Sequence, residues 1–378
     1  MMGFQRQKSN ILPGILYITI IVTVLSQIDA LPLVRPLMYG CWIVLVGFLV
    51  ASTHGLLPKT KFNAIFLTTF FIFIFYCLIC SLFKPAYLSN HYLRIMVIPL
   101  LVTIVGSYLY NTISTDEIYK LCCIYTITSL IFAIYIHFTY FASYQSWLSN
   151  NEYIFAQKNS AAQIWCTGVL IIYFIILPKS KNKAFWIIAS IYLLFISAIS
   201  QCRTALLAMI VVLIYNVLVN TRKKILWIGI IVCVFLILYR YPTTRTFFDH
   251  AFLVDKYNDA NFNTMSSGRP DLWKAALIVF ENNVLIGSGS YYVDSSYVLI
   301  LAESGIIGFL LIEYIWIRRI GGNFIHSITS FSKRHFLDSL TIFYIVESIL
   351  EGYPPFGPGS SSFLFWLLAS YADMDGSV

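Results

Sequence analysis

Two arginines lie where a positive charge needs an explanation. One is at the junction of two apolar runs, and the other is at the start of a predicted helix. The first, Arg203, lies in SAISQCRTALLAMI, where one long apolar run ends and the next begins without a soluble loop between them. A charge at that depth needs a partner or a function, unless it only extends toward the interface and caps the turn. The surrounding residues are small or polar: Ser197, Ser200, Gln201 and Thr204. Such neighbours are typical of a water-filled cavity, so we favour a functional role for Arg203.

The second arginine, Arg269, lies in SSGRPDLWKAALIVF. Pro270 follows it, and the apolar residues beyond recur at helical spacing, which predicts an amphipathic helix lying against the membrane. These apolar residues are Leu272, Trp273, Ala276, Leu277 and Phe280. The start of such a helix presents free N–H groups and a positive dipole, and with Arg269 it suits an anion such as diphosphate. The alternative is a capped surface helix in which Arg269 pairs with Asp271.

Two carboxylates follow in VDSSYVLILAESGIIGF. Asp294 opens the next apolar run, and Glu303 comes nine residues later, about 14 Å along a helix axis. A carboxylate within a membrane span is a candidate functional group, and Asp294 is the first candidate for a general base, with Glu303 second. Glu303 can instead hold a neighbouring helix through a hydrogen bond or through the charge of Arg203. Gly305 and Gly308 favour close packing of helices here.

Other polar residues near these segments are candidates for binding substrate. The string YIFAQKNSAA places Lys158 and Asn159 at the start of another apolar run, although Lys158 can equally be an interfacial anchor. Aromatic residues such as Tyr291 can stack on sugar faces, and they are also common at membrane interfaces. The substrate-binding candidates are Lys158, Asn159, Lys274, Tyr291 and Ser295. Glu347 and Glu351 lie beside a Pro/Gly-rich turn in the last hairpin. This hairpin either closes the chamber of the site or only reverses the chain, and we favour the second interpretation.

The elements that must position these residues are membrane-spanning helices. Hydrophobic residues make up 59% of the 378 residues and charged residues only 11%, whereas about a quarter of a soluble domain is charged. Apolar runs long enough to cross a bilayer as helices lie at 11–28, 37–54, 63–83, 93–112, 117–141, 161–178, 184–201, 203–219, 224–240 and 295–317, with weaker ones at 336–350 and 360–372. The sequence thus predicts an all-α, polytopic membrane helical bundle with about 11 to 12 transmembrane helices.

Positive charges set the orientation of this bundle. Short Lys and Arg clusters at 179–183, 222–224 and 318–319 fall on one side when the amino terminus is cytoplasmic, as the positive-inside rule expects. The chain then divides into transmembrane helices over 1–240, a long external loop over 241–294, and carboxy-terminal transmembrane helices over 295–378. The external loop contains the amphipathic helix and is periplasmic in a Gram-negative cell. The net charge of +8 reflects this topology, so we expect no nucleic-acid binding.

Several other chemistries find no support in the sequence. The eight cysteines lie within or beside predicted helices, so we expect no disulfide framework, and we interpret Cys77 and Cys80 as packing residues. The six histidines show no paired-ligand spacing, so we expect no metal. The glycine motifs that bind ATP or dinucleotides are also missing from the sequence, and no cofactor is expected.

The motifs resemble, in their order, those of the O-antigen ligase and polymerase superfamily, the membrane enzymes of bacterial lipopolysaccharide assembly: KNSAA, CRTALLA, SGRPDLWKAALIVFENNVLIGSGSYY and DSSYVLILAESGIIG. The resemblance covers about residues 155–317. It implies a metal-independent glycosyltransferase of the GT-C type in the bacterial inner membrane, acting at the periplasmic face on sugars carried by undecaprenyl diphosphate. The family's two functional arginines correspond to Arg203 and Arg269, which implies that both hold the lipid diphosphate.

Within this superfamily, one position favours a polymerase. Family ligases commonly have His where Asp294 stands and Asn where Ser295 follows. An acidic residue at the first position resembles polymerases of the Wzy type, which join lipid-linked repeat units and whose partners include a chain-length regulator. The alternatives are an O-antigen ligase that transfers glycan to lipid A core, a lipid-linked oligosaccharide flippase, and a structural membrane scaffold.

Overall fold

The computed structural model describes residues 11–28, 31–52, 60–141, 158–220, 226, 229, 233, 236–251, 266, 268–325, 336–357 and 361–375. The regular secondary structure in these ranges is helical. The helices are α1 (Leu12–Leu25), α2 (Val34–Ser52), α3 (Lys61–Ser81), η1 (Pro85–Ser89), α4 (His91–Ile95), α5 (Val97–Thr112), α6 (Thr115–Tyr140), α8 (Lys158–Ile171), η2 (Ile172–Ile176), α9 (Leu177–Lys179), α10 (Lys183–Ile199), α11 (Arg203–Asn220), α13 (Pro242–Ala251), α15 (Arg269–Glu281), α16 (Ser296–Ile325), α17 (Phe336–Leu350) and α18 (Phe363–Asp375).

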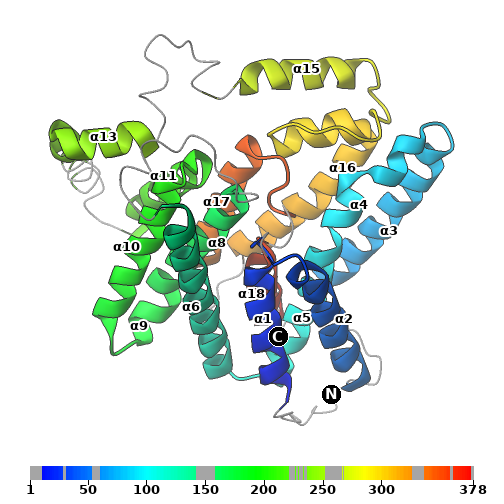
Figure 1. Cartoon of the computed structure of the whole chain (residues 1–378). Coiled ribbons are helices and arrows are strands. Elements are labelled where there is room, and N and C mark those ends of the chain that lie inside the picture. The colour runs from blue at the N-terminus through cyan, green and yellow to red at the C-terminus, as the bar shows by residue number, and fades with distance from the viewer. Residues whose placement is uncertain are drawn as a thin grey trace.

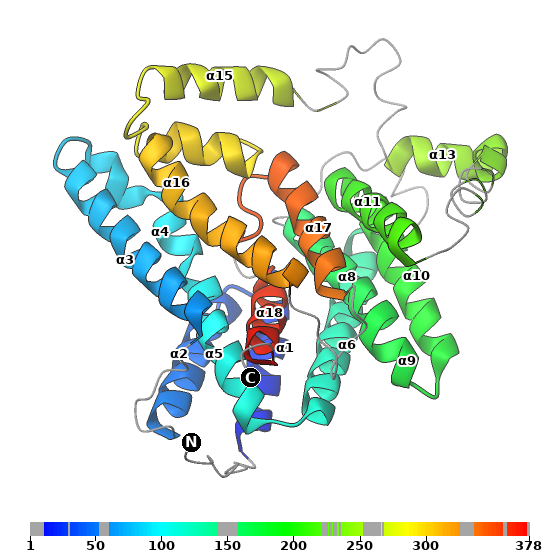
Figure 2. The same cartoon turned by 180° about the vertical axis from the view of Figure 1, so that it is seen from behind.

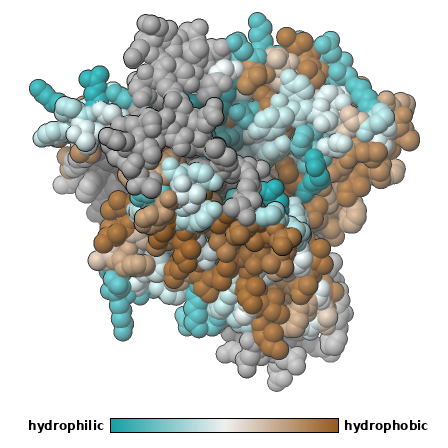
Figure 3. Space-filling model, in the orientation of Figure 1, coloured by the Kyte–Doolittle hydropathy of each residue, from teal (hydrophilic) through white to brown (hydrophobic). Residues whose placement is uncertain are grey.

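The helices pack into a bundle, seen from two sides in Figures 1 and 2. α5 packs against α18, α3 against α16, and α11 against α17, while α8 contacts α6, α10 and α11. Among the described residues, six helical segments are long and apolar enough to cross a membrane, and four shorter apolar helices accompany them. Apolar side chains cover much of the surface of the bundle in Figure 3. The predicted all-α, polytopic membrane fold is confirmed.

Polar side chains fix where several helices begin. Thr60 accepts a hydrogen bond from the backbone N–H of Asn63 (3.0 Å), and Ser114 accepts one from Glu117 (3.3 Å). Each cap satisfies an N–H group that the first turn of a helix leaves free. The connection from α10 to α11 is only residues 200–202, so Arg203 begins α11 directly after the tight turn that the sequence predicts.

α16 is not the continuous helix that the apolar run predicts. Gly305 has φ 63° and ψ −171°, which breaks α16 into a first half before it and a second half after it. In Figure 1 the first half lies beneath α15, and the second half descends through the bundle. Gly305 therefore breaks the helix, whereas the sequence predicts that it allows close packing of helices. Gly308 does lie close to a neighbouring helix, because a Cβ at this position would be 3.5 Å from Phe73 of α3.

The loop at residues 284–289 pairs with the backbone groups that this break exposes. The N–H groups of Ser288 and Gly289 donate to the carbonyls of Ala302 and Glu303 (2.9 and 2.8 Å), and the first N–H after Gly305 donates to a carbonyl of the loop at 2.9 Å. Buried backbone groups must find partners, so the loop makes the break possible inside an apolar bundle. The GSG and ESG strings of the sequence meet at this point.

The helices α13 and α15 lie at one end of the bundle, hereafter the α15 end (Figure 1). α15 packs against α16 and buries Ala276, while Leu272 and Leu277 are exposed. The amphipathic helix predicted from Pro270 onward thus forms, beginning at Arg269. Most of the span predicted at 224–240 and the loop residues 252–265 lie outside the described residues.

Arg319 occupies a place that its sequence neighbourhood does not predict. The sequence predicts a cytoplasmic cluster with Arg318, and the structure shows that the side chain of Arg319 is fully buried. Its Nη2 lies 2.9 Å from Oδ2 of Asp373 in α18, and its guanidinium carbon lies 3.6 Å from the ring centroid of Phe62 in α3. Arg319 therefore ties α16 to two other helices, while Arg318 is exposed.

Candidate functional site

A polar cluster centres on the carboxylate of Glu351 at the α15 end. Its Oε1 accepts hydrogen bonds from Arg269 Nη2 (2.9 Å) and Thr204 Oγ1 (2.7 Å), and its Oε2 accepts one from Asn159 Nδ2 (2.7 Å). The side chains of Arg269 and Glu351 are 15% and 7% exposed, so this ion pair is largely removed from water. Hydrogen bonds that carry charge are among the strongest that proteins make. These four residues are the Glu351 cluster.

Each member of the Glu351 cluster stands at the end of a helix. Asn159 and Thr204 are the second residues of α8 and α11, Arg269 is the first residue of α15, and Glu351 directly follows α17. α8, α11 and α17 pack against one another, which brings three of these ends together. Helix ends carry backbone groups without partners inside the helix, so a place where they meet favours polar side chains.

Burial controls the charge state of this cluster. It raises the pKa of the Glu351 carboxyl, while the charge of Arg269 and the hydrogen bond from Thr204 act in the opposite direction. Arg269 also keeps a further donor, because its buried Nε has no hydrogen-bond partner among the described residues. The cluster thus combines a guanidinium that can still donate with an acid that gains a proton more readily than an exposed glutamate.

A second polar layer lies one helical turn deeper. Gln163 Nε2 donates to Glu347 Oε2 (3.1 Å), and Gln163 Oε1 accepts a hydrogen bond from Ser361 Oγ (2.5 Å). Gln163 lies one turn after Asn159 on α8, and Glu347 lies one turn before Glu351 on α17. The side chains of this layer are buried, so it fixes α8, α17 and the start of α18 relative to one another beneath the Glu351 cluster.

Arg203 and Lys158 each precede a member of the cluster in sequence. Arg203 stands next to Thr204 at the start of α11, and Lys158 stands next to Asn159 at the start of α8. The carbonyl of Lys158 accepts a hydrogen bond from Cys202 Sγ (3.3 Å), so the two helix starts are in contact. The strings KNSAA, CRTALLA and SGRPDLW, which are far apart in sequence, therefore meet in one place.

Asp294 lies in the connection between α15 and α16. Its backbone carbonyl accepts a hydrogen bond from Trp273 Nε1 (2.7 Å), and its Oδ1 accepts one from the hydroxyl of Tyr292 (2.8 Å). The ring of Tyr292 lies 5.6 Å from that of Tyr353, two residues after Glu351. Burial raises the pKa of Tyr292, and it raises the pKa of Tyr353 to about 12. Both tyrosines therefore stay neutral and form an aromatic, hydrogen-bonding surface beside the cluster.

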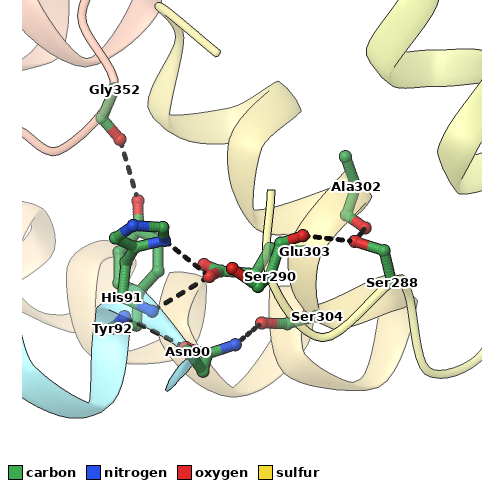
Figure 4. Close-up of polar contacts among 9 residues, drawn as sticks. All are labelled: Asn90, His91, Tyr92, Ser288, Ser290, Ala302, Glu303, Ser304 and Gly352. Carbon is green, nitrogen blue, oxygen red and sulfur yellow. Dashed lines mark hydrogen bonds and ion pairs between the residues drawn. The ribbon is translucent and has the colours of Figure 1, made fainter. Parts of the chain in front are cut away.

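Glu303 pairs with His91, a residue that the sequence did not single out. Glu303 Oε1 accepts a hydrogen bond from the backbone N–H of His91 (2.9 Å) and lies 2.8 Å from His91 Nδ1 (Figure 4). The Glu303 side chain is fully buried, whereas that of His91 is 26% exposed. Of the two structural alternatives for Glu303, the structure therefore shows the hydrogen bond to a neighbouring helix and not an ion pair with Arg203.

The remaining substrate-binding candidates are not members of the Glu351 cluster. Tyr291 is half-buried and packs against the apolar core. Ser295 is buried, and its backbone N–H donates to the carbonyl of Val293 at 3.0 Å. Lys274 is exposed on α15 and makes no hydrogen bond or ion pair to the part of the chain that the structure describes.

An apolar groove of about 1090 Å³ lies beside α11. It is lined by residues of α8, η2, α9, α10, α11 and α13, and its lining on α11 extends from Leu206 to Val217. The eleven residue-to-residue steps from Leu206 to Val217 correspond to about 16 Å along the helix axis. The groove begins within one helical turn of Arg203 and Thr204, so it leads away from the polar cluster along the side of the bundle.

A comparison with known protein families finds a match in the part of the chain that contains Arg203 and Arg269. Residues 188–312 match the family model described as O-antigen ligase. The match covers about a third of the chain and supports a relation to the O-antigen ligase and polymerase superfamily, and the long apolar helices indicate a multi-pass membrane protein. No curated protein matches the chain.

The region that matches the family model contains Arg203 and Arg269, but Glu351, the carboxylate partner of Arg269, lies outside it. Glu351 belongs to the hairpin that was interpreted as a simple reversal of the chain, and this interpretation missed its contacts with Asn159, Thr204 and Arg269. The available signal was a pair of acids, Glu347 and Glu351, spaced by one helical turn at the end of an otherwise apolar helix.

Proposed function

We propose that this protein is an O-antigen polymerase, which joins oligosaccharide repeat units carried by undecaprenyl diphosphate at the outer face of the bacterial inner membrane. The observation that carries the proposal is the convergence of three distant motifs at Glu351. It places Arg269 beside the start of α11, where Arg203 stands, within the region that matches the O-antigen ligase family. The lysine-bearing connection between α9 and α10 lies at the other end of the bundle (Figure 1), which supports an outward-facing α15 end.

The chemistry of this reaction suits a site built from arginines. A hydroxyl of the acceptor sugar attacks the anomeric carbon of the donor glycan, and undecaprenyl diphosphate leaves with the bonding electrons. This leaving group is a weak base, so it needs stabilisation of negative charge more than it needs a proton. Arg269 retains a buried N–H donor without a partner among the described residues, and with Arg203 it supplies that positive charge. A single direct displacement inverts the configuration of the anomeric carbon.

The apolar groove along α11 supports a lipid-linked substrate. A diphosphate held near Arg203 and Arg269 puts the start of its polyprenyl chain near Leu206, the first residue of α11 that lines the groove. The groove then continues for about 16 Å between membrane-spanning helices, where an apolar chain is stable. A soluble sugar nucleotide has no apolar chain that could bind in this groove.

Ligase activity is the second candidate, because the matching family model is described as O-antigen ligase. The two reactions share the donor and differ in the acceptor, which is another lipid-linked repeat for a polymerase and lipid A core for a ligase. Asp294 and Ser295, which stand where family ligases commonly have His and Asn, support the polymerase.

Lipopolysaccharide from a strain lacking the gene distinguishes the two candidates when it is separated by chain length. A polymerase predicts core that carries a single repeat unit. Core without O-antigen, together with polymer retained on the lipid carrier, identifies a ligase. An unchanged ladder of long chains contradicts both.

Arginine substitutions test the site itself. We expect Arg203→Ala and Arg269→Ala each to abolish long chains without loss of the protein from the membrane, because each removes charge from the leaving-group site. Arg318→Ala is the matched control, since Arg318 is exposed on α16 away from the cluster, and it should leave the ladder unchanged. The measurement is the chain-length distribution at equal protein levels, and a normal ladder in Arg269→Ala overturns the assignment.

A further inference from the structure

The proposed reaction uses the Glu351 cluster but leaves the pair of His91 and Glu303 without a role. Figure 4 shows the carboxylate of Glu303 directed at His91, with both the backbone N–H and Nδ1 of His91 at Oε1 (2.9 and 2.8 Å). Glu303 is fully buried, whereas the side chain of His91 is 26% exposed, so the carboxylate holds the Nδ1 side of a partly exposed imidazole. His91 Nε2 makes no hydrogen bond to the described residues.

Several contacts fix this pair in addition to its own hydrogen bonds. Asn90 Nδ2, one residue before His91, donates to Ser304 Oγ (3.0 Å), one residue after Glu303. A Cβ on Gly289 would lie 2.8 Å from a ring carbon of Tyr87, so the loop at 284–289 also packs closely on η1. The break at Gly305 ends the first half of α16 just beyond Glu303, which lets its carboxylate meet the start of α4.

The pair lies next to the turn that carries Glu351. The His91 ring is 5.8 Å from that of Tyr353, and the hydroxyl of Tyr92 donates to the carbonyl of Gly352 at 3.2 Å. The charged and titratable groups around His91 are Glu303 from α16, Arg94 from its own helix, Tyr353, and Asp294 beyond Tyr353. His91 thus adjoins the aromatic surface of Tyr353 and Tyr292, where a sugar ring can stack.

We propose that His91 is the proton acceptor for the acceptor hydroxyl, and that Glu303 positions it; this inference rests on the proposed glycosyl transfer. Nδ1 donates to Glu303, which leaves Nε2 as the free base. Nε2 takes the hydroxyl proton while the oxygen forms the new bond to the anomeric carbon and the bond to the diphosphate breaks. The imidazolium is stabilised by the buried carboxylate and later returns its proton to water.

Two other arrangements compete with this one. Asp294, the first candidate from the sequence, has a carboxylate that already accepts a hydrogen bond from Tyr292 (2.8 Å). The pair can also serve only to anchor α4 to α16. If the pair only anchors α4 to α16, a side chain that makes the same hydrogen bonds preserves function. Glu303→Gln tests this alternative, because the glutamine amide oxygen can accept both hydrogen bonds.

The experiment uses the purified full chain in lipid nanodiscs with undecaprenyl-diphosphate-linked repeat units extracted from a strain lacking the gene. Polymer formation is measured against pH for wild type, His91→Gln, His91→Ala, Glu303→Gln and Asp294→Asn. His137→Gln is the control, since His137 bonds only the hydroxyl of Tyr192 among the described residues. Thermal unfolding of each variant separates loss of folding from loss of chemistry.

For His91→Gln we expect kcat to fall by about 100- to 10,000-fold with little change in KM, the scale of a removed general base. In His91→Gln we also expect the decline of activity at low pH to disappear. Added imidazole should restore part of the rate of His91→Ala. Glu303→Gln should fold normally and have a lower kcat. Wild-type activity in a folded His91→Gln, a normal kcat in Glu303→Gln, or loss of the acid decline only in Asp294→Asn overturns the inference. Wild type that forms no polymer from these units refutes the proposed function instead.

Discussion

One carboxylate, that of Glu351, accepts hydrogen bonds from all three other members of its cluster. Removing one partner of a buried charge pair costs more than the pair contributes, because the charge that stays is left without compensation. Arg269 depends most on this carboxylate, since Thr204 and Asn159 are neutral. Glu351 therefore affects both the stability and the chemistry of the site.

We expect Glu351→Gln to lower the free energy of unfolding by about 2 kcal/mol, because the amide still accepts from neutral donors but no longer balances Arg269. Thermal unfolding of the purified protein in detergent measures this change. Glu281→Gln at the exposed end of α15 is the matched control and should unfold at the wild-type temperature. Equal unfolding temperatures for both variants would show that the ion pair contributes nothing to the fold.

At the scale of elements, the broken helix α16 does most to shape the site. Gly287 and Gly305 meet backbone to backbone, since a Cβ on Gly305 would lie 2.6 Å from the Gly287 nitrogen and 2.5 Å from the Leu285 carbonyl oxygen. Both glycines have positive φ, at 68° and 63°, where side chains are strained. No other residue type fits this contact without moving the loop at 284–289 or the end that carries Glu303.

We expect Gly305→Ala to destabilise the protein by about 3 kcal/mol and to lower activity, because the new methyl group collides with backbone and not with a flexible side chain. Gly40→Ala is the control, since nothing lies within 4 Å of a Cβ at this position in α2. The readouts are thermal unfolding and polymer formation. A Gly305→Ala protein as stable as wild type would mean that the loop can relax at little cost.

Much of the architecture could be predicted from the sequence, because apolar runs report membrane helices directly. The predicted span at 336–350 coincides with α17, and the predicted tight turn before Arg203 is present. The break at Gly305 could not be predicted, since the apolar pattern continues across it and its cause is a loop some twenty residues earlier in the chain. The partners of Arg269 and Glu303 were missed for the same reason, because Glu351 and His91 are brought to them by tertiary packing.

Across the whole molecule, Arg319 marks the end of the bundle away from the site. It joins α16 to Asp373 of α18 and covers Phe62 of α3. α3 and α18 flank the second half of α16, whose first half carries Glu303. A buried guanidinium at this position therefore fixes the lower end of the helix on which the site depends.

We expect Arg319→Met to destabilise the fold by about 3 kcal/mol, because the largely buried charge of Asp373 loses the guanidinium that compensates it. The double variant with Asp373→Asn should recover part of this loss, since neither charge then remains. Arg318→Met, at an exposed neighbouring position, should be silent. Unfolding temperatures of these three variants and of Asp373→Asn alone test the pairing, and additive losses in the double variant would contradict it.

The internal ion pair of Arg269 with Glu351 means that the resting protein already holds a counter-anion where a diphosphate is proposed to bind. Substrate binding is then an exchange of anions, and the released carboxylate, whose pKa burial raises and Arg269 lowers, takes up a proton. Affinity for a lipid diphosphate should therefore increase as the pH falls through the pKa of Glu351, and calorimetry in buffers of different ionisation enthalpy should detect the proton taken up. In Glu351→Gln that uptake should vanish, so the proton balance of binding reports directly on which anion Arg269 holds.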